Sequence, residues 1–115
     1  TENLNLLFGP AASERSKYAL NKHYAKINTT NFGNRYCEIG HLTTTATSLT
    51  GSAKPVDPPI NPGDQVVLIF ATIGDDHYVS LNGKLQHSVQ SPLPASPAGY
   101  ETVVRTNMSP CRWTG

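Results

Sequence analysis

The first apolar pattern along this 115-residue chain has the spacing of a helix. Leu20, Tyr24 and Ile27 recur at intervals of four and three residues, which predicts one amphipathic helix over residues 10–27. Pro10 suits the first turn of such a helix, because its fixed φ matches helical geometry. The apolar stripe is narrow, so we expect this helix to lie on another element rather than inside a core.

After residue 34 the pattern is typical of strands and turns. The Thr-rich segment 35–49 predicts one or two exposed strands, and the strongly apolar run 65–73 predicts the central strand of a sheet. Further strands are expected at 77–81, 84–90 and 100–106. Proline-rich loops separate them at 51–63 and 91–99.

Asn82-Gly83 between two strand-like runs predicts a β-hairpin. A two-residue turn would pair apolar residues with polar ones on each face of this hairpin. We therefore expect a three-residue loop, Leu81-Asn82-Gly83, with Gly83 in the left-handed conformation as a bulge. That loop aligns four apolar residues on one face: Val79, Leu81, Leu85 and Val89.

The N-terminal nine residues are rich in large apolar side chains. Leu4, Leu6, Leu7 and Phe8 lie in this segment, which packs either on its own domain or on another chain. Combined with the helical stripe, they form the hypothetical partner interface. Its seven residues are Leu4, Leu6, Leu7, Phe8, Leu20, Tyr24 and Ile27.

Together these elements predict an α+β fold in a single domain, 1–115. One N-terminal amphipathic helix packs on an antiparallel β-meander of three to five strands. The apolar segment 1–9 precedes the helix 10–27. Strands and Pro-rich loops occupy 35–106, and a tail follows at 107–115.

Composition favours an exported protein. Hydrophobic residues make up 37% of the chain and charged residues 15%, so the core is small. Cys37 and Cys111 lie far apart and match no metal signature; they form one long-range disulfide or remain two buried free thiols. We expect the disulfide, because a crosslink stabilises a small polar domain. An oxidising compartment follows from that disulfide. Because the sequence begins without Met and without a signal peptide, we expect a mature chain whose leader has been removed.

Charge and motifs exclude several classes of function. The net charge of +1 gives no basis for binding nucleic acid or an anionic membrane, and no apolar run is long enough to span a bilayer. His77 and His87 lie near the acidic turn Asp75-Asp76, but such acidic residues usually serve the turn alone. Neither His23 nor His41 has a partner in the pattern. We therefore expect no catalytic site, no cofactor and no metal.

The order of elements resembles the globular head of a type IV pilin: a helix, a Thr-rich loop, a meander and a cysteine-closed tail. The segment Asn3-Leu4-Asn5-Leu6-Leu7-Phe8-Gly9-Pro10 and the tail Ser109-Pro110-Cys111-Arg112-Trp113 are similar to geopilin domain 2 proteins, the separate head chain of a split pilin. The resemblance implies a structural subunit in the periplasm and then in an extracellular filament. Its partners would be a short helical pilin, bound non-covalently, and neighbouring copies of itself.

A second interpretation is a small secreted carbohydrate-binding β-sandwich. The hairpin His77-Tyr78-Val79-Ser80-Leu81-Asn82-Gly83-Lys84 resembles strands of galectin-like sandwiches, although the Trp and Arg pattern of a galectin site is missing. Exposed aromatic residues would supply a platform for the sugar. The candidates are Tyr36, Tyr78, Tyr100 and Trp113.

Overall fold

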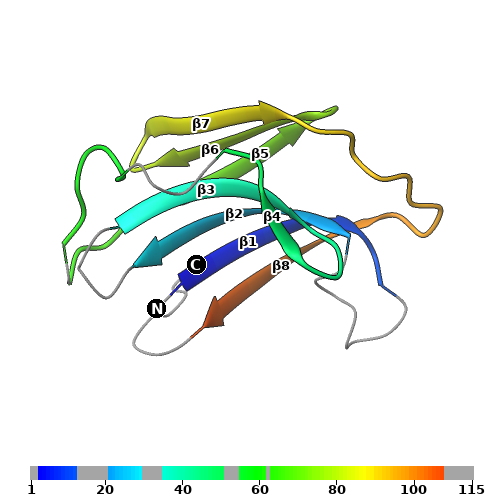
Figure 1. Ribbon diagram of the computed structural model, residues 1–115, viewed down its shortest axis with the longest axis horizontal. Coiled ribbons are helices and arrows are strands. Elements are labelled where there is room, and N and C mark those ends of the chain that lie inside the picture. The colour runs from blue at the N-terminus through cyan, green and yellow to red at the C-terminus, as the bar shows by residue number, and fades with distance from the viewer. Residues whose placement is uncertain (1–2, 13–20, 30–34, 51–54, 62, 108–115) are drawn as a thin grey trace.

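The protein is a two-layer all-β sandwich over the residues that its structure describes. The computed structural model describes residues 3–12, 21–29, 35–50, 55–61 and 63–107. Eight strands occupy this part of the chain (Figure 1). They are β1 (Asn3–Pro10), β2 (Lys22–Thr29), β3 (Arg35–Leu42), β4 (Ala46–Ser48), β5 (Leu68–Ile73), β6 (Asp76–Leu81), β7 (Lys84–Gln90) and β8 (Tyr100–Asn107).

The strands form two antiparallel sheets. The first sheet has five strands in the order β4-β3-β2-β1-β8, and the second has three in the order β5-β6-β7. Figure 1 shows the three-stranded sheet lying over the five-stranded one. The N-terminal strand β1 lies between β2 and β8, so the first strand of the chain meets the last one.

The core lies between the two sheets and follows from strand alternation. Residues paired across antiparallel strands share a face, and every second residue points to the same side. Leu4 and Leu6 therefore share the inner face of the five-stranded sheet with Ile27 and Ala25 of β2. The buried core residues are Ala25, Ile27, Cys37, Ile39, Val56, Leu68, Val79 and Leu81.

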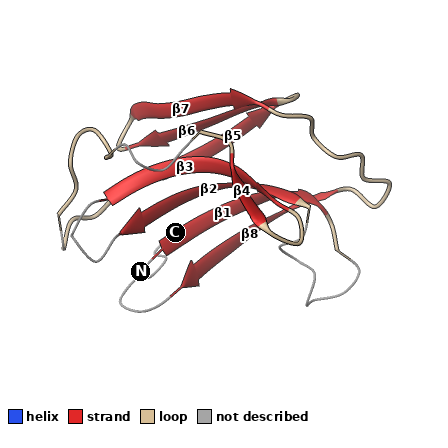
Figure 2. Cartoon of the chain, in the orientation of Figure 1, coloured by secondary structure: helices blue, strands red, loops and turns tan. Residues whose placement is uncertain are grey.

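The predicted helix 10–27 is wrong, and with it the α+β class. Figure 2 shows strands and loops but no helix in the described part, and residues 22–27 belong to β2. In this strand Tyr24 and Ile27 point to opposite faces, since they are an odd number of residues apart. Pairing with β1 and β3 outweighs a weak local helical stripe. Leu20, the third residue of that stripe, lies outside the described residues.

The expected disulfide is not found either. Cys37 is a free thiol, almost fully buried in the core, and Cys111 lies outside the described residues. Cys37 is paired with Ile27 in the register of β2 and β3, so it takes an ordinary apolar position between the sheets. Burial, followed by the charge of Glu38, raises the pKa of this thiol to about 12, so it is protonated at neutral pH.

Two strand assignments also change. Strand β5, within the run predicted as the central strand, is an edge strand, and β6 is the centre of its sheet. The segment predicted as exposed forms two strands of different burial. Strand β3 has buried residues from Cys37 to Gly40, whereas all three residues of β4 are exposed. Strand β8 lies where the last strand was expected.

The hairpin closes by a two-residue turn, not by the expected three-residue loop. Leu81 pairs with Lys84, and the backbone angle φ is 51° at Asn82 and 83° at Gly83. The predicted left-handed conformation of Gly83 is therefore correct. The register shifts further along the hairpin, where Val79 pairs with His87 but Ser80 with Leu85, which leaves Gln86 as the extra residue.

This bulge changes which apolar residues face the core. Val79 and Leu81 are fully buried and Val89 packs against the core, as expected. Leu85 precedes the bulge and is 57% exposed, contrary to the prediction. The extra residue in the bulge thus shifts which positions of β7 face the core, as the three-residue loop was expected to do.

We predict that Gly83→Ala lowers the free energy of unfolding by about 1 kcal/mol. A Cβ at this position would meet no atom within 4 Å, so the effect comes from the left-handed backbone alone. Urea unfolding followed by circular dichroism measures it. Ser88→Ala, on an exposed site of β7, is the control and should stay within about 0.5 kcal/mol of the parent. Equal stability of both variants would contradict the prediction.

Candidate binding face

Polar side chains form two rows on the outer face of the five-stranded sheet, the side opposite the core. In one row the register places Asn3 beside Asn28 of β2, which lies beside Tyr36 of β3. The second row crosses four strands and contains Arg105, Asn5, Lys26 and Glu38. We call these seven residues the polar face. Strand alternation alone brings them together, since successive side chains along a strand point to opposite faces of the sheet.

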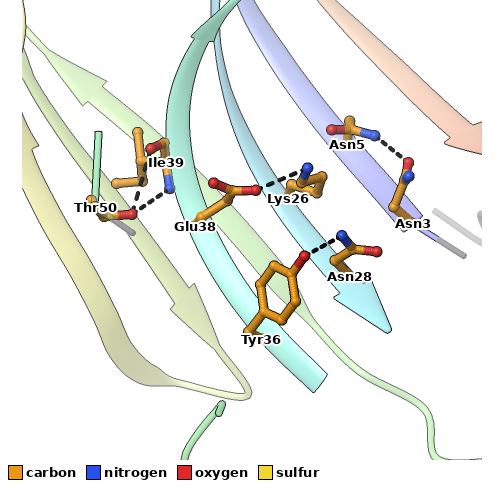
Figure 3. Close-up of polar contacts among 8 residues, drawn as sticks. All are labelled: Asn3, Asn5, Lys26, Asn28, Tyr36, Glu38, Ile39 and Thr50. Atoms are coloured by element: carbon orange, nitrogen blue, oxygen red, sulfur yellow. Dashed lines mark hydrogen bonds and ion pairs between the residues drawn. The ribbon is translucent and has the colours of Figure 1, made fainter. Parts of the chain in front are cut away.

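Specific contacts join the members of the polar face (Figure 3). Lys26 Nζ lies 2.9 Å from Glu38 Oε1, in an ion pair whose side chains are 20% and 5% exposed. The Nδ2 of Asn28 donates to Tyr36 Oη at 2.6 Å, and the Nδ2 of Asn5 donates to Asn3 Oδ1 at 2.7 Å. These contacts hold the side chains in defined orientations before any ligand arrives.

An aromatic ring lies beside the polar rows. Tyr24 is buried on the same outer face, paired with Leu7 of β1 and Gly40 of β3. Its ring crosses Gly40, where a Cβ would overlap it. Lys26 Nζ lies 5.7 Å from the ring centroid. Burial, followed by the charge of Glu38, raises the pKa of Tyr24 to about 12, so its hydroxyl is protonated at neutral pH.

A buried lysine continues this face at the other end of β2. Lys22 is fully buried, and its Nζ donates to Pro10 O at 2.8 Å and lies 3.0 Å from Glu101 Oε1. Glu101 Oε1 also accepts from the backbone N–H of Ala12 at 3.2 Å. The hydrogen bond from Lys22, followed by the one from Ala12, lowers the pKa of Glu101. This end of the face is therefore a structural clamp between β1, β2 and β8.

The outer face of the three-stranded sheet has a different character. Its exposed residues include Ile69, Ile73 and Leu85. A groove of about 370 Å³ between β1, β8 and the edge strand β5 is also mainly apolar, with no titratable side chain in its lining. Polar contacts occur on the three-stranded sheet too, between Asp57 and the side chains of Lys84 and Gln86, but the polar rows that cross several strands lie on the five-stranded sheet.

The seven predicted interface residues do not share one face. Leu4, Leu6 and Phe8 alternate with Leu7 along β1, and Ile27 and Tyr24 are likewise on opposite sides of the sheet. Leu20 lies outside the described residues. Strand alternation therefore places some of the predicted interface residues toward the core and others on the outer face.

The predicted aromatic platform is also divided. Tyr36 belongs to the polar face, whereas Tyr78 lies on the three-stranded sheet. Tyr100 stacks on Phe8 at a ring-centroid distance of 5.5 Å. Trp113 lies outside the described residues. One of the four candidates therefore lies in the site.

Sequence reasoning missed most of the polar face. Asn5, Lys26, Asn28 and Glu38 carried a period-two signal, because each alternates with apolar residues in Leu4-Asn5-Leu6, Ala25-Lys26-Ile27-Asn28 and Cys37-Glu38-Ile39. The helical interpretation of 10–27 concealed this signal in β2. The partners of His23 and His41 were missed too, since they come from separate strands.

Neither a metal site nor a relative identifies the chain. In the part that the structure describes, no group of three or more His, Cys, Asp or Glu side chains is placed to hold a metal ion. The same residues contain no helix long and apolar enough to cross a membrane. Models of protein families, curated proteins and solved structures yield no match to this chain.

Proposed function

We propose that this protein is a carbohydrate-binding β-sandwich and that the polar face holds the saccharide. The observation that carries the proposal is the set of paired polar side chains beside Tyr24 on the outer face of the five-stranded sheet. A solvated sheet face normally carries exposed, independent polar residues. Here Glu38 and Asn28 are buried and joined to their neighbours.

The chemistry of this face suits a sugar. A saccharide presents hydroxyl groups that both donate and accept hydrogen bonds, together with apolar C–H patches. The amides of Asn3 and Asn5 donate and accept, Arg105 only donates, and Glu38 accepts. Tyr36 offers an aromatic surface with a polar tip. Because the ion pair and the amide contacts already fix several side chains, less conformational entropy is lost on binding.

We propose binding without catalysis. Hydrolysis of a glycosidic bond ordinarily needs two carboxyl groups on either side of the scissile bond. Glu38 is the one carboxylate in the two polar rows, and it is paired with Lys26. The role of this face is therefore recognition.

The pilin interpretation loses one of the two observations on which it rested. It began from a helix ahead of a meander, and the described part of the chain begins with strands. Export to the periplasm was inferred from the disulfide; Cys37 is a free thiol, and Cys111 lies outside the described residues. We therefore carry the second interpretation forward.

A glycan array followed by calorimetry tests the proposal. We predict that the purified protein binds at least one class of saccharide and that Asn5→Ala weakens this binding about three- to tenfold, as loss of one hydrogen-bonding group does. Asn5 is half-buried, and among the described residues its amide contacts Asn3, so the fold should tolerate the change.

Gln90→Ala is the matched control. Gln90 is an exposed amide on β7, on the other sheet, and its removal should leave the affinity unchanged. Thermal melts show whether each variant stays folded. Absence of binding across neutral, acidic and amino sugars would refute the function, and equal losses for Asn5→Ala and Gln90→Ala would refute the site.

A further inference from the structure

Three histidines from both sheets form one continuous stack inside the sandwich. His41 of β3 and His23 of β2 have ring centroids 4.3 Å apart and an interplanar angle of 6°. His23 and His77 of β6 have centroids 4.2 Å apart and an angle of 19°. His23 therefore lies between a ring of its own sheet and a ring of the opposite sheet.

Hydrogen bonds through Ser91 join the same histidines. His77 Nε2 lies 3.0 Å from Ser91 O, and His23 Nε2 lies 2.9 Å from Ser91 Oγ. The backbone N–H of Ser91 donates to Asp75 O at 2.9 Å. One residue at the end of β7 thus connects a histidine of each sheet with the turn before β6.

The outer rings differ from the central ring in their hydrogen bonding. A carbonyl oxygen only accepts, so Nε2 of His77 carries a proton, while its Nδ1 lies 2.9 Å from Thr72 Oγ1. His41 Nε2 lies 3.2 Å from Asn21 Oδ1. His23 is fully buried, and its Nδ1 has no hydrogen-bond partner among the residues that the structure describes. A second proton on His23 would therefore place an unsatisfied N–H in the interior.

Burial and the two neighbouring histidines disfavour a positive charge on the ring of His23. The titratable neighbours are His41 from β3, His77 from β6 and Asp75 from the turn, while Phe8 of β1 is its pair in the register. Tyr100 of β8 stacks on Phe8, and the ring centroids of Phe70 of β5 and His77 lie 6.0 Å apart. Burial, followed by His77 and His41, lowers the pKa of His23 from 6.5 to about 4, and Asp75 acts in the opposite direction.

We propose that the stack of His41, His23 and His77 is an acid-sensitive latch between the two sheets. Neutral imidazoles stack and hold the sheets together. A proton taken up at His23 Nδ1 places a cation between two rings at a fully buried position. The charge becomes solvated only when His77 and Ser91 move away, which separates the sheets at this end of the sandwich.

The direction of the pH effect follows from proton linkage. The unfolded chain binds the proton on His23 at a higher pH than the folded chain does, so folding is favoured above 6.5 and weakened as the pH falls toward about 4. Across this interval the unfolding equilibrium constant should rise about tenfold for each pH unit, through this one group.

Urea unfolding across this pH range, with the parent and a His23→Phe variant, tests the latch. Phe keeps an aromatic ring between His41 and His77 but takes up no proton. The rise of about tenfold per pH unit in the unfolding equilibrium constant should therefore be absent from the variant. His87→Gln, on β7 of the other sheet, is the control and should keep the parent slope. Equal slopes for the parent and His23→Phe would overturn the proposal.

A nuclear magnetic resonance titration of the parent protein provides a second measurement that needs no variant. We expect the ring signals of His23 to keep their neutral positions at about pH 5.5, and amide exchange in β6 to accelerate below that pH. A native His23 that takes up its proton near pH 6.5 would overturn the latch, even if His23→Phe does not fold.

Discussion

Lys22→Ala should lower the free energy of unfolding by about 2–5 kcal/mol, which is the range for truncating a long buried side chain. Lys22 is fully buried, and its methylene groups fill space beside Gly9, where a Cβ would lie only 2.9 Å from Lys22 Cγ. The truncation leaves a cavity there. It also removes the donor to Pro10 O and the partner of Glu101.

Lys22→Met separates these two contributions. Methionine refills most of the space without the charge, and Glu101 is 27% exposed, so water can reach its carboxylate. We expect Lys22→Met to recover more than half of the stability that Lys22→Ala loses. Urea unfolding with a common m-value measures both variants. Equal stabilities of the two would show that the ammonium group, and not packing, holds this end of the sheet.

Gly40→Ala should cost about 1–3 kcal/mol, as is usual when an atom is forced into a filled site. The new Cβ would overlap the ring of Tyr24, which crosses Gly40 on the outer face. The ring must then leave its position, and the cation–π contact between Tyr24 and Lys26 is lost. If the polar face binds a saccharide, the affinity should fall as well.

A double-mutant cycle locates the cause. Removing the ring in Tyr24→Ala/Gly40→Ala relieves the overlap, so the added Cβ should cost less there than in the parent background. Thr47→Ala, on the exposed strand β4, serves as a control that should stay within about 0.5 kcal/mol. Additive effects of Gly40→Ala and Tyr24→Ala would contradict the contact between them.

The parts predicted well are those with strong local signals. Asn82-Gly83 marks the turn of a hairpin by its backbone preference alone, and β6, β7 and β8 lie where alternation placed strands. The failures come from weaker local signals. Three apolar residues in the segment 10–27 have helical spacing, yet two of them, Tyr24 and Ile27, lie on opposite faces of the strand β2.

The candidate site could not be assembled from the chain alone. Lys26 and Glu38 lie in different strands, and only the register of β2 and β3 sets them opposite each other. His23 and His77 come from different sheets, so no spacing in the sequence brings their rings together. The two-residue turn leaves Leu85 facing solvent, and the bulge at Gln86 then brings Val89 onto the core side, a shift that turn chemistry does not contain.

By itself, the sequence determined the β-rich second half, the position of the hairpin and the left-handed Gly83, but not the length of the turn, because turn chemistry and alternation act between near neighbours. The tertiary structure decided that residues 22–29 form a strand, that Cys37 is a core thiol, and which polar and histidine side chains meet. Strand order and register depend on burying one face of each sheet against the other. Strand order and register are therefore set by the packing of the whole sandwich, and no single segment of the sequence determines them.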